Sequence, residues 1–239
     1  MENMNGFLNI NKPKGFTSHD VVDFIRRRFE FPRVGHLGTL DPMARGVLPL
    51  ALGKSTKHSA QLIQGEKEYE GFFLLGIETD TQDIEGKVSA LKEIPHISIE
   101  ELNEISGQFH GEREQLTPMF SARRHKGKRL FELARKGQEV ERRLRGIHIY
   151  KFKIISLEFP RLRFYVHCSK GTYIRTLAHD FGKIVGCGAC LLDLVRLRKG
   201  PFVFSESVSL TDLADFASFR KHLIPEEKIV DCKDNLKSA

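Results

Sequence analysis

Apolar and polar residues alternate along the first part of the chain with the periods of short strands and helices. These periods predict strands over 8–11, 47–52 and 67–77, and helices over 17–29 and 55–63. Thr17 and Asp20 have the spacing of a capping box at the start of the first helix. In the strand over 67–77, Tyr69, Phe73 and Leu75 share one face, because side chains in a strand point alternately to its two sides.

The second part of the chain contains further strands that come in pairs. Its periods predict helices over 98–109, 130–134, 171–185 and 209–223, and strands over 147–157, 162–168 and 191–197. Two of these strands meet near Pro160, so antiparallel pairing is the economical arrangement. Strands outnumber helices and do not alternate strictly with them, which favours an α+β fold over a doubly wound sheet.

The composition is that of a globular protein. With 239 residues and 40% hydrophobic residues, the chain can bury its own core as one large domain or two smaller ones. No apolar stretch approaches the roughly 18 residues of a membrane span. Residues 1–6 lack the basic and apolar regions of a signal peptide. We therefore predict a cytoplasmic location and no membrane partner.

The cysteines do not predict a disulfide framework or a metal site. They are Cys168, Cys187, Cys190 and Cys232. They are few and scattered, so we expect free thiols. Cys187 and Cys190 match C-x-x-C, but no second pair or nearby histidine cluster completes a tetrahedral zinc site. We expect small-residue packing there, and neither a metal nor another cofactor.

Positive charge is concentrated in one segment. The chain has a formal net charge of +7. Residues 120–146 hold ten Lys or Arg residues and three Glu residues, so this segment accounts for the whole excess. A local excess of this kind is typical of a surface that binds phosphates and releases their counterions.

A loop over residues 33–48 carries the candidate chemistry. Glycines and Pro42 bracket Asp41, and they restrict or permit backbone conformations that give such a loop a defined shape. His36 precedes Asp41 by five residues and Arg45 follows it by four. This arrangement suits chemistry on an anionic substrate, although Asp41 and Pro42 alone are also typical of the start of an ordinary turn.

Four motifs in order resemble the TruB family of tRNA pseudouridine synthases. They are the run GHLGTLDPMARGVLPL over 35–50, LNINKPKGFTS over 8–18, KEY over 67–69 and CSKGTYIRTL over 168–177. The similarity spans roughly residues 7–203. It implies a central mixed, mostly antiparallel sheet flanked by helices, with an active-site cleft across one face. It also implies isomerisation of the T-loop uridine of tRNA, uridine-55, to pseudouridine, with the tRNA T-arm as the partner.

The resemblance assigns catalytic roles to three residues. Asp41 would attack or stabilise the anomeric carbon of a flipped-out uridine, as a carboxylate does in retaining glycoside hydrolysis. Arg175 would lie beside that carboxylate and orient it. Tyr69 would stack on the target base and exchange the C5 proton, although a tyrosine on a strand is more often a core aromatic.

Further residues are assigned to substrate binding. His36 would take the space left by the extruded uridine, and Leu194 would form an aliphatic wall of the uracil pocket or simply pack in the core. Asp83 would hold Arg175 or merely belong to a turn. Lys12 would face the RNA backbone or be solvated in a turn.

The basic segment resembles the RNA-gripping insertion of the family, in which Arg123, Arg124 and Lys126 would bind RNA. Some positions in and after the insertion depart from the usual pattern of the family. These positions are Thr117, Phe120, Arg123, Arg124, Cys190 and Val195.

The domain organisation follows from the same resemblance. We expect residues 1–210, with an insertion over about 115–146, to form the catalytic domain. Residues 211–239 are expected to form a short helix and a mobile charged tail after Pro225, without the separate RNA-binding module of most bacterial relatives. A monomer without an obligatory protein partner is expected. The alternatives are a guide-RNA-dependent subunit, a non-catalytic tRNA chaperone and a glycosidase acting on small nucleosides.

Overall fold

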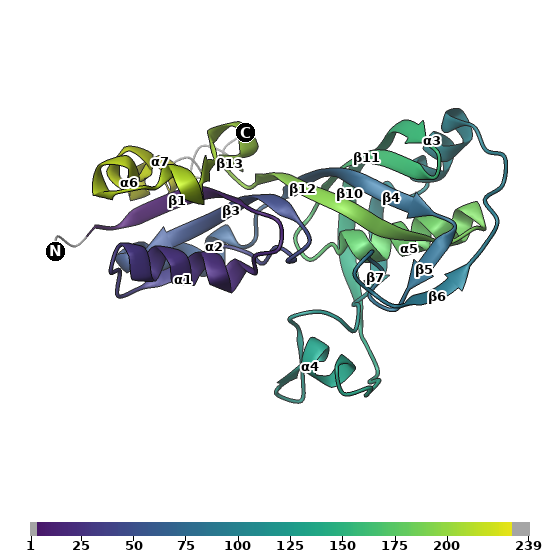
Figure 1. The fold of residues 1–239 in the computed structure, drawn as a ribbon, viewed down its shortest axis with the longest axis horizontal. Coiled ribbons are helices and arrows are strands. Elements are labelled where there is room, and N and C mark those ends of the chain that lie inside the picture. The colour runs from purple at the N-terminus through teal and green to yellow at the C-terminus, as the bar shows by residue number, and fades with distance from the viewer. Residues whose placement is uncertain (1–3, 231–239) are drawn as a thin grey trace. The chain divides into compact units, whose positions relative to one another are not determined.

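The computed structural model describes residues 4–230, which form two compact units (Figure 1). Unit 1 contains the residues up to Tyr69 and those from Val195 on, and unit 2 contains Glu70–Leu194. The helices are α1 (Ser18–Arg28), α2 (Ser59–Leu62), α3 (Ile99–Gly107), α4 (Leu130–Ala134), α5 (Ile174–Val185), α6 (Phe216–His222) and α7 (Glu226–Val230). Three 3₁₀ turns, Gly53–His58, Phe204–Glu206 and Leu210–Asp212, complete the helical elements.

The strands form a ten-stranded mixed sheet and two small two-stranded sheets. They are β1 (Gly6–Lys12), β2 (Val34–His36), β3 (Arg45–Leu52), β4 (Lys67–Leu75), β5 (Ile77–Thr79), β6 (Val88–Leu91), β7 (Gly111–Leu116), β8 (Arg124–His125), β9 (Lys128–Arg129), β10 (Leu144–Glu158), β11 (Arg161–Cys168), β12 (Ala189–Lys199), β13 (Phe202–Val203) and β14 (Val208–Ser209). The main order is β14-β1-β3-β12-β4-β11-β10-β7, and strands β4 and β12 run from one unit into the other. The predicted α+β class with a mixed sheet is confirmed.

Unit 1 is built on strand β3. Strand β1 pairs with it antiparallel from Gly6 opposite Leu52 to Lys12 opposite Gly46, and β2 pairs with it antiparallel as well. The end of β12 pairs with the start of β3 in parallel. The Thr17 capping box begins α1 as predicted, and the apolar face of this helix is buried.

Unit 2 is built around a cluster of phenylalanines between its strands and two helices. Phe73 on β4 stacks on Phe164 on β11 with ring centroids 4.1 Å apart. Phe152 on β10 contacts Phe181 of α5 and the Phe109 ring that follows α3, at 5.6 Å and 5.7 Å. Strands β10 and β11 pair antiparallel, as predicted. The connection between β7 and β10 carries the basic insertion with α4 (Figure 1).

Three predicted helices differ from the structure. The segment 55–63 forms a 3₁₀ turn followed by the four-residue α2. The segment 209–223 is not one helix, because the Ser209 and Asp212 capping box opens only a 3₁₀ turn. Leu213 then leaves the helical conformation, and a second capping box of Asp215 and Ser218 begins α6. Helix α5 begins at Ile174 rather than Gly171, which has a φ of +83°.

The chain after Pro225 begins with a helix instead of the expected mobile tail. Glu226 in α7 accepts hydrogen bonds from Ser55 at 2.8 Å and from the His58 ring at 2.6 Å, and Lys57 lies 3.1 Å away. These bonds hold α7 against the 3₁₀ turn Gly53–His58. The rest of the expected tail, 231–239, and Cys232 lie outside the described residues. Among residues 4–230, no helix has the length and apolar character needed to span a membrane.

Replacing Glu226 should lower stability in a pH-dependent way. Hydrogen bonds from His58 and Ser55 lower the pKa of Glu226 from 4.5 to about 2. A carboxylate with a lowered pKa stabilises the folded state above its unfolded pKa and loses this effect as the pH falls. We expect Glu226→Gln to cost about 1 kcal/mol at pH 7. Urea unfolding should show this difference shrinking below about pH 4.5 and vanishing near pH 2. The neighbouring exposed Glu227→Gln serves as the control, and an equal loss in both variants would contradict the assignment.

Candidate functional site

Asp41 lies in a compact loop between β2 and β3. Its side chain is half-buried, and the loop residues Leu40 and Met43 on either side are buried at 4% and 1% exposure. The Ala44 N–H donates to the Asp41 carbonyl at 3.1 Å, which closes a turn around Pro42. The Leu40 N–H donates to the Ser18 hydroxyl at 2.9 Å, and that hydroxyl contacts the Leu40 carbonyl at 3.1 Å. The loop therefore has the defined shape that its sequence predicted.

A fully buried arginine holds both ends of this loop. Arg196 on β12 donates from Nε to the Val47 carbonyl at 2.7 Å. It also donates from Nη1 to Thr39 at 3.0 Å and from Nη2 to Gly38 at 3.1 Å. The guanidinium presents its donors in a fixed plane, so three carbonyls on either side of Asp41 are fixed relative to one another.

A glycine is required at the start of β3 because the main chain of Arg196 on β12 approaches it closely. Gly46 has a φ of +102°, and a Cβ at this position would lie 2.4 Å from the Arg196 carbonyl. Any side chain there would push β3 away from β12.

Lys12 is not in the position expected from the sequence. It is fully buried rather than exposed to RNA or solvent. Its ammonium donates to the carbonyls of Phe16 at 2.6 Å, Pro13 at 2.9 Å and Pro42 at 3.3 Å. A buried cation needs such partners because its desolvation is costly. Lys12 therefore braces the Asp41 loop at Pro42.

His36 is the last residue of β2, not a loop residue as expected, and its ring is half-buried. Burial lowers the pKa of His36 below its ordinary value of 6.5, and the charges of Arg196 and His19 lower it further. The imidazole is therefore neutral at neutral pH. Its Nδ1 is buried and has no hydrogen-bond partner among the described residues. A neutral ring of this kind is suited to contact with a base rather than with a phosphate.

Tyr69 lies on β4 and is 5% exposed. Buried and half-buried residues alternate along β4, and Tyr69, Phe73 and Leu75 are all among the buried ones. The predicted shared face is therefore confirmed. Leu194 on β12, in unit 2, is 4% exposed and is consistent with either of its predicted roles.

Arg175 and Asp83 meet within unit 2. Arg175 stands in the first turn of α5 and is 5% exposed. It donates to the carbonyls of Thr81 at 3.1 Å and Phe120 at 2.7 Å, and its Nη1 lies 3.5 Å from the Asp83 carboxylate. Asp83 in turn accepts from the Thr81 hydroxyl at 2.6 Å. The expected pairing of Asp83 with Arg175 is therefore present.

Gln115 also fixes the start of α5. Its amide donates to the Tyr173 carbonyl at 3.0 Å and accepts from the Tyr173 N–H at 2.8 Å. Neither Gln115 nor Arg196 was predicted from the sequence. A signal for Arg196 was present, because it shares a strand face with Leu194 where an apolar residue is expected.

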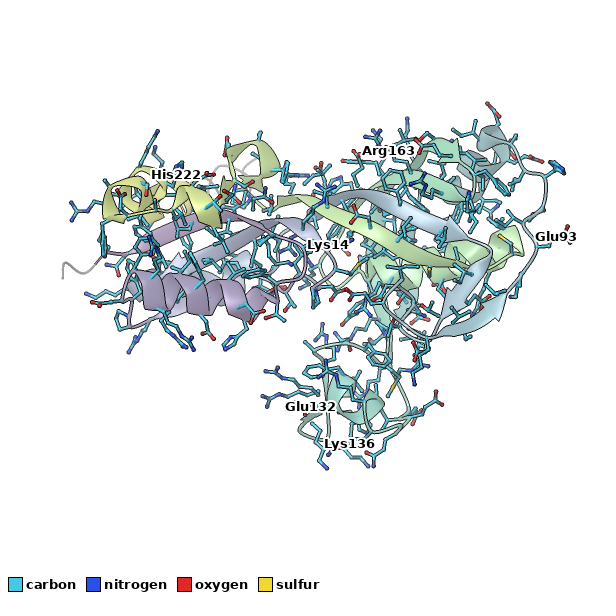
Figure 2. All side chains as sticks on the ribbon, viewed as in Figure 1. Lys14, Glu93, Glu132, Lys136, Arg163 and His222 are labelled. Atoms are coloured by element: carbon cyan, nitrogen blue, oxygen red, sulfur yellow. The ribbon has the colours of Figure 1, made fainter. Side chains whose placement is uncertain are left out.

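The three basic candidates of the insertion are exposed. Arg123, Arg124 and Lys126 lie before and within the small β8–β9 hairpin, and Lys126 has a φ of 47° in its turn. Figure 2 labels Glu132 and Lys136 on the same insertion. The accessible cations of this segment are suited to bind phosphates.

Cys187 and Cys190 are buried free thiols, and Cys168 is buried as well. Burial raises the pKa of Cys190 to about 11, and the nearby Asp83 carboxylate contributes to the increase. A thiol protonated at neutral pH is neither a nucleophile nor a ready metal ligand. Within residues 4–230, no cluster of His, Cys, Asp and Glu could hold a metal ion.

Removing the Arg196 guanidinium should destabilise the protein. Arg196→Leu removes the donors to three carbonyls, of which that of Val47 is buried, so we expect a loss of about 3 kcal/mol in the free energy of unfolding. Arg196→Lys keeps the charge but presents fewer suitably directed donors, and it should lose less. Arg198→Leu on the same strand is the control, since its side chain is 31% exposed in ion pairs with glutamates. A loss of about 0.5 kcal/mol is expected there. Chemical denaturation checks these values, and equal losses in Arg196→Leu and Arg198→Leu would contradict the clamp.

Comparisons with known proteins identify the family of this chain. The model of the TruB family pseudouridylate synthase N-terminal domain matches residues 26–174, and that of the tRNA pseudouridylate synthase B C-terminal domain matches residues 175–232. The tRNA pseudouridine synthase B of Alkaliphilus oremlandii is 44% identical over 222 residues, which are 93% of this chain and 74% of that relative. The enzyme of the same name from Geotalea uraniireducens is 47% identical over 211 residues, or 88% of this chain and 68% of the relative.

A solved structure also resembles this chain. The crystal structure of a Cbf5-Nop10-Gar1 complex contains a chain that is 31% identical, with a TM-score of 0.75. The match covers 94% of this chain and 61% of the other. On this evidence, the chain belongs to the TruB family and is an RNA pseudouridine synthase.

Proposed function

We propose that this enzyme isomerises the T-loop uridine of tRNA to pseudouridine, and that Asp41 is its catalytic carboxylate. The observation that carries the proposal is the position of Asp41 in a loop whose carbonyls are fixed by Arg196 and Lys12. Reactions at an anomeric carbon depend on accurate placement of the attacking group. A braced loop provides that placement.

The reaction needs no external group. The bond between N1 of uracil and C1′ of ribose breaks, while an Asp41 oxygen attacks or stabilises the electron-poor C1′. The released uracil turns so that its C5 faces C1′. The new C5–C1′ bond forms as any Asp41 ester breaks, C5 loses its proton and N1 gains one. The enzyme must therefore aim the carboxylate and keep water from trapping the sugar.

Other residues serve the same reaction in this proposal. Tyr69 supports the base and exchanges the C5 proton, and the neutral His36 ring fills the space from which the uridine has left. Arg175, oriented by Asp83 at 3.5 Å, acts in catalysis, and Leu194 bounds the uracil. The basic insertion, with Arg123, Arg124 and Lys126, grips the T-arm.

The relatives support a tRNA substrate. The two bacterial relatives described above carry the name tRNA pseudouridine synthase B and are 44% and 47% identical to this chain. The chain from the Cbf5-Nop10-Gar1 complex is less similar, at 31%. We therefore expect the protein to act on tRNA in the absence of a guide RNA or protein partner.

Asp41→Ala should abolish catalysis while keeping RNA binding. We expect the wild type to release tritium from tRNA labelled at uracil C5, and the variant to lose this release because no carboxylate reaches C1′. Affinity for tRNA, measured by filter binding, should stay within about threefold, since one half-buried loop side chain contributes little to the phosphate contacts that dominate binding. Asp23→Asn, on the surface of α1, should behave as the wild type. Tritium release by Asp41→Ala would exclude Asp41 from the mechanism. Absence of release by the wild type would refute the proposed activity.

Neutralising the insertion should weaken tRNA binding. In a triple alanine variant of Arg123, Arg124 and Lys126, each lost phosphate contact should reduce the slope of log affinity against log salt by about 0.7 to 0.9. The catalytic rate at saturating tRNA should be kept. The charge-matched control changes Lys87, Arg161 and Lys183 of unit 2, which are exposed outside the insertion. Equal loss of affinity in both variants would mean that net charge, rather than the insertion, determines binding.

A further inference from the structure

One face of the β10–β11 hairpin carries four aromatic rings that are exposed or half-buried. Ile149 pairs with Cys168 and Lys151 pairs with His167, so a β-bulge interrupts the ladder between Ile149 and Lys151. A bulge sets two consecutive residues of one strand opposite one residue of the other. Tyr150 and Lys151 are therefore both exposed on the face that His167 also occupies.

The opposite face of the same hairpin is apolar and buried. Ile147, Ile149, Phe152 and Ile154 of β10 are buried, together with alternate residues of β11. Buried residues have odd numbers up to Ile149 and even numbers from Phe152 on. This switch in the alternation is caused by the extra residue of the bulge. The exposed rings thus lie on the face away from the phenylalanine core of unit 2.

Four rings on the exposed face form what we call the aromatic strip: His148, Tyr150, Tyr165 and His167. The rings of His148 and Tyr150 have centroids 4.5 Å apart at 34°, and those of Tyr150 and His167 are 4.7 Å apart at 37°. Both ring pairs are tilted, and Tyr150, which contacts the other two rings, is still 44% exposed. These rings therefore lie on the open face of the hairpin rather than in the core.

Lysines lie among these rings. The Lys151 ammonium stands 5.7 Å from the centroid of Tyr165, and Lys153 pairs with Tyr165 across the ladder. Both lysines are exposed. Aromatic faces interleaved with cations are the arrangement that binds single-stranded nucleic acid, because bases stack on the rings while the cations contact the backbone.

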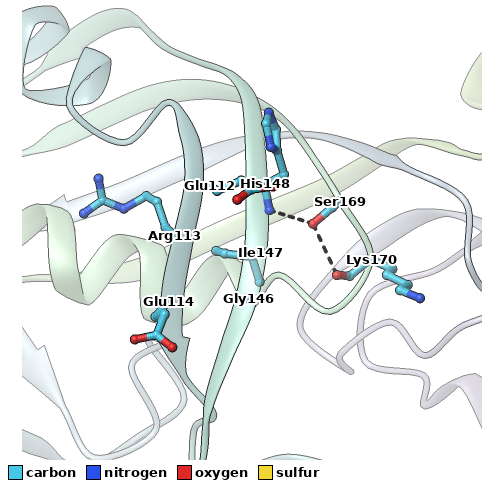
Figure 3. A pocket seen from close by; sticks show the side chains of 8 residues that line it. All are labelled: Glu112, Arg113, Glu114, Gly146, Ile147, His148, Ser169 and Lys170. Carbon is cyan, nitrogen blue, oxygen red and sulfur yellow. Dashed lines mark hydrogen bonds between the residues drawn. The ribbon is translucent and has the colours of Figure 1, made fainter.

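The strip continues into an open hollow of about 540 Å³ at the β7–β10 edge (Figure 3). Its lining includes His148, Lys170 and the exposed carboxylates of Glu112 and Glu114. Glu112 pairs directly with His148 across the ladder, so the two side chains share a face. The Ser169 hydroxyl accepts from the His148 N–H at 2.8 Å and fixes the far wall.

The carboxylates of Glu112 and Glu114 favour some RNA bases over others as ligands of this hollow. Glutamates beside a phosphate site would repel the backbone, but they accept hydrogen bonds from the exocyclic amino groups of cytosine, adenine and guanine. Uracil has no such group and offers its carbonyl oxygens instead. A base that stacks on His148 would reach Glu112, which is its cross-strand neighbour.

We propose that the aromatic strip is a second RNA-binding surface, which takes single-stranded RNA and prefers bases with exocyclic amino groups over uracil. The strip contains none of the residues of the proposed catalytic reaction, so this inference does not depend on it. Stacking on Tyr150 supplies most of the binding, Lys151 contacts the backbone, and Glu112 provides the base preference.

Fluorescence anisotropy with short labelled oligo(C) and oligo(U) tests the proposal on the whole protein. An excess of unlabelled T-arm hairpin is added to occupy the proposed catalytic site. We expect oligo(C) to bind the wild type at least about fivefold more tightly than oligo(U) under these conditions. Tyr150→Ala should weaken oligo(C) binding at least about fivefold, while Tyr150→Phe keeps the ring and should bind as the wild type.

Charge variants separate the remaining contributions. Lys151→Ala should weaken binding and reduce its salt dependence, and Lys183→Ala on α5 is the matched control that should not. Glu112→Gln should reduce the preference for oligo(C). Unfolding curves and tritium release from the T-arm hairpin should be unchanged in Tyr150→Ala. Displacement of oligo(C) by the hairpin, equal binding of oligo(C) and oligo(U), or undiminished binding by Tyr150→Ala would each overturn the proposal.

Discussion

The hydrogen bonds of the Arg196 guanidinium to three main-chain carbonyls are the contact on which the shape of the Asp41 loop depends. The side chain is fully buried, and its donors reach Val47 beyond the loop as well as Gly38 and Thr39 at its start. A cation without such partners would be costly to bury. The charge and the loop conformation therefore stabilise each other, because any other loop conformation would leave the buried cation without hydrogen-bond acceptors.

Other buried cations in unit 1 follow the same rule. Lys12 donates to carbonyls that include Pro42, and Lys199 donates to Leu62, Ile63 and Gly65 at 2.9–3.0 Å. The Lys199 ammonium thus satisfies carbonyls at the end of α2, a helix too short to be stable by itself. In unit 2, Arg175 likewise binds carbonyls of Thr81 and Phe120 as well as the Asp83 carboxylate. Long basic side chains thus replace regular secondary structure in fixing loops around the candidate residues.

The sequence predicted those features that depend on local chemistry. The capping box at Thr17 begins a helix as expected, a helix is present within the predicted range 98–109, and the alternation around Tyr69 gives its burial correctly. The helix over 209–223 was wrong, because a capping box specifies where a helix begins and not how far it extends. Lys12 and Arg196 were misjudged or missed for a different reason. Their burial depends on carbonyls far away in the sequence, and a charged residue is by default expected at the surface.

The root of the insertion is joined to the helix that carries Arg175 at two points. Gln115 binds the main chain of Tyr173 just before α5, and Arg175 itself binds the Phe120 carbonyl. Beyond this joint the insertion makes its own small hairpin and helix. Natural variation in the length and composition of the tip can therefore accumulate without moving α5, whereas a single inserted residue between Gln115 and Phe120 would shift the anchorage of the arginine.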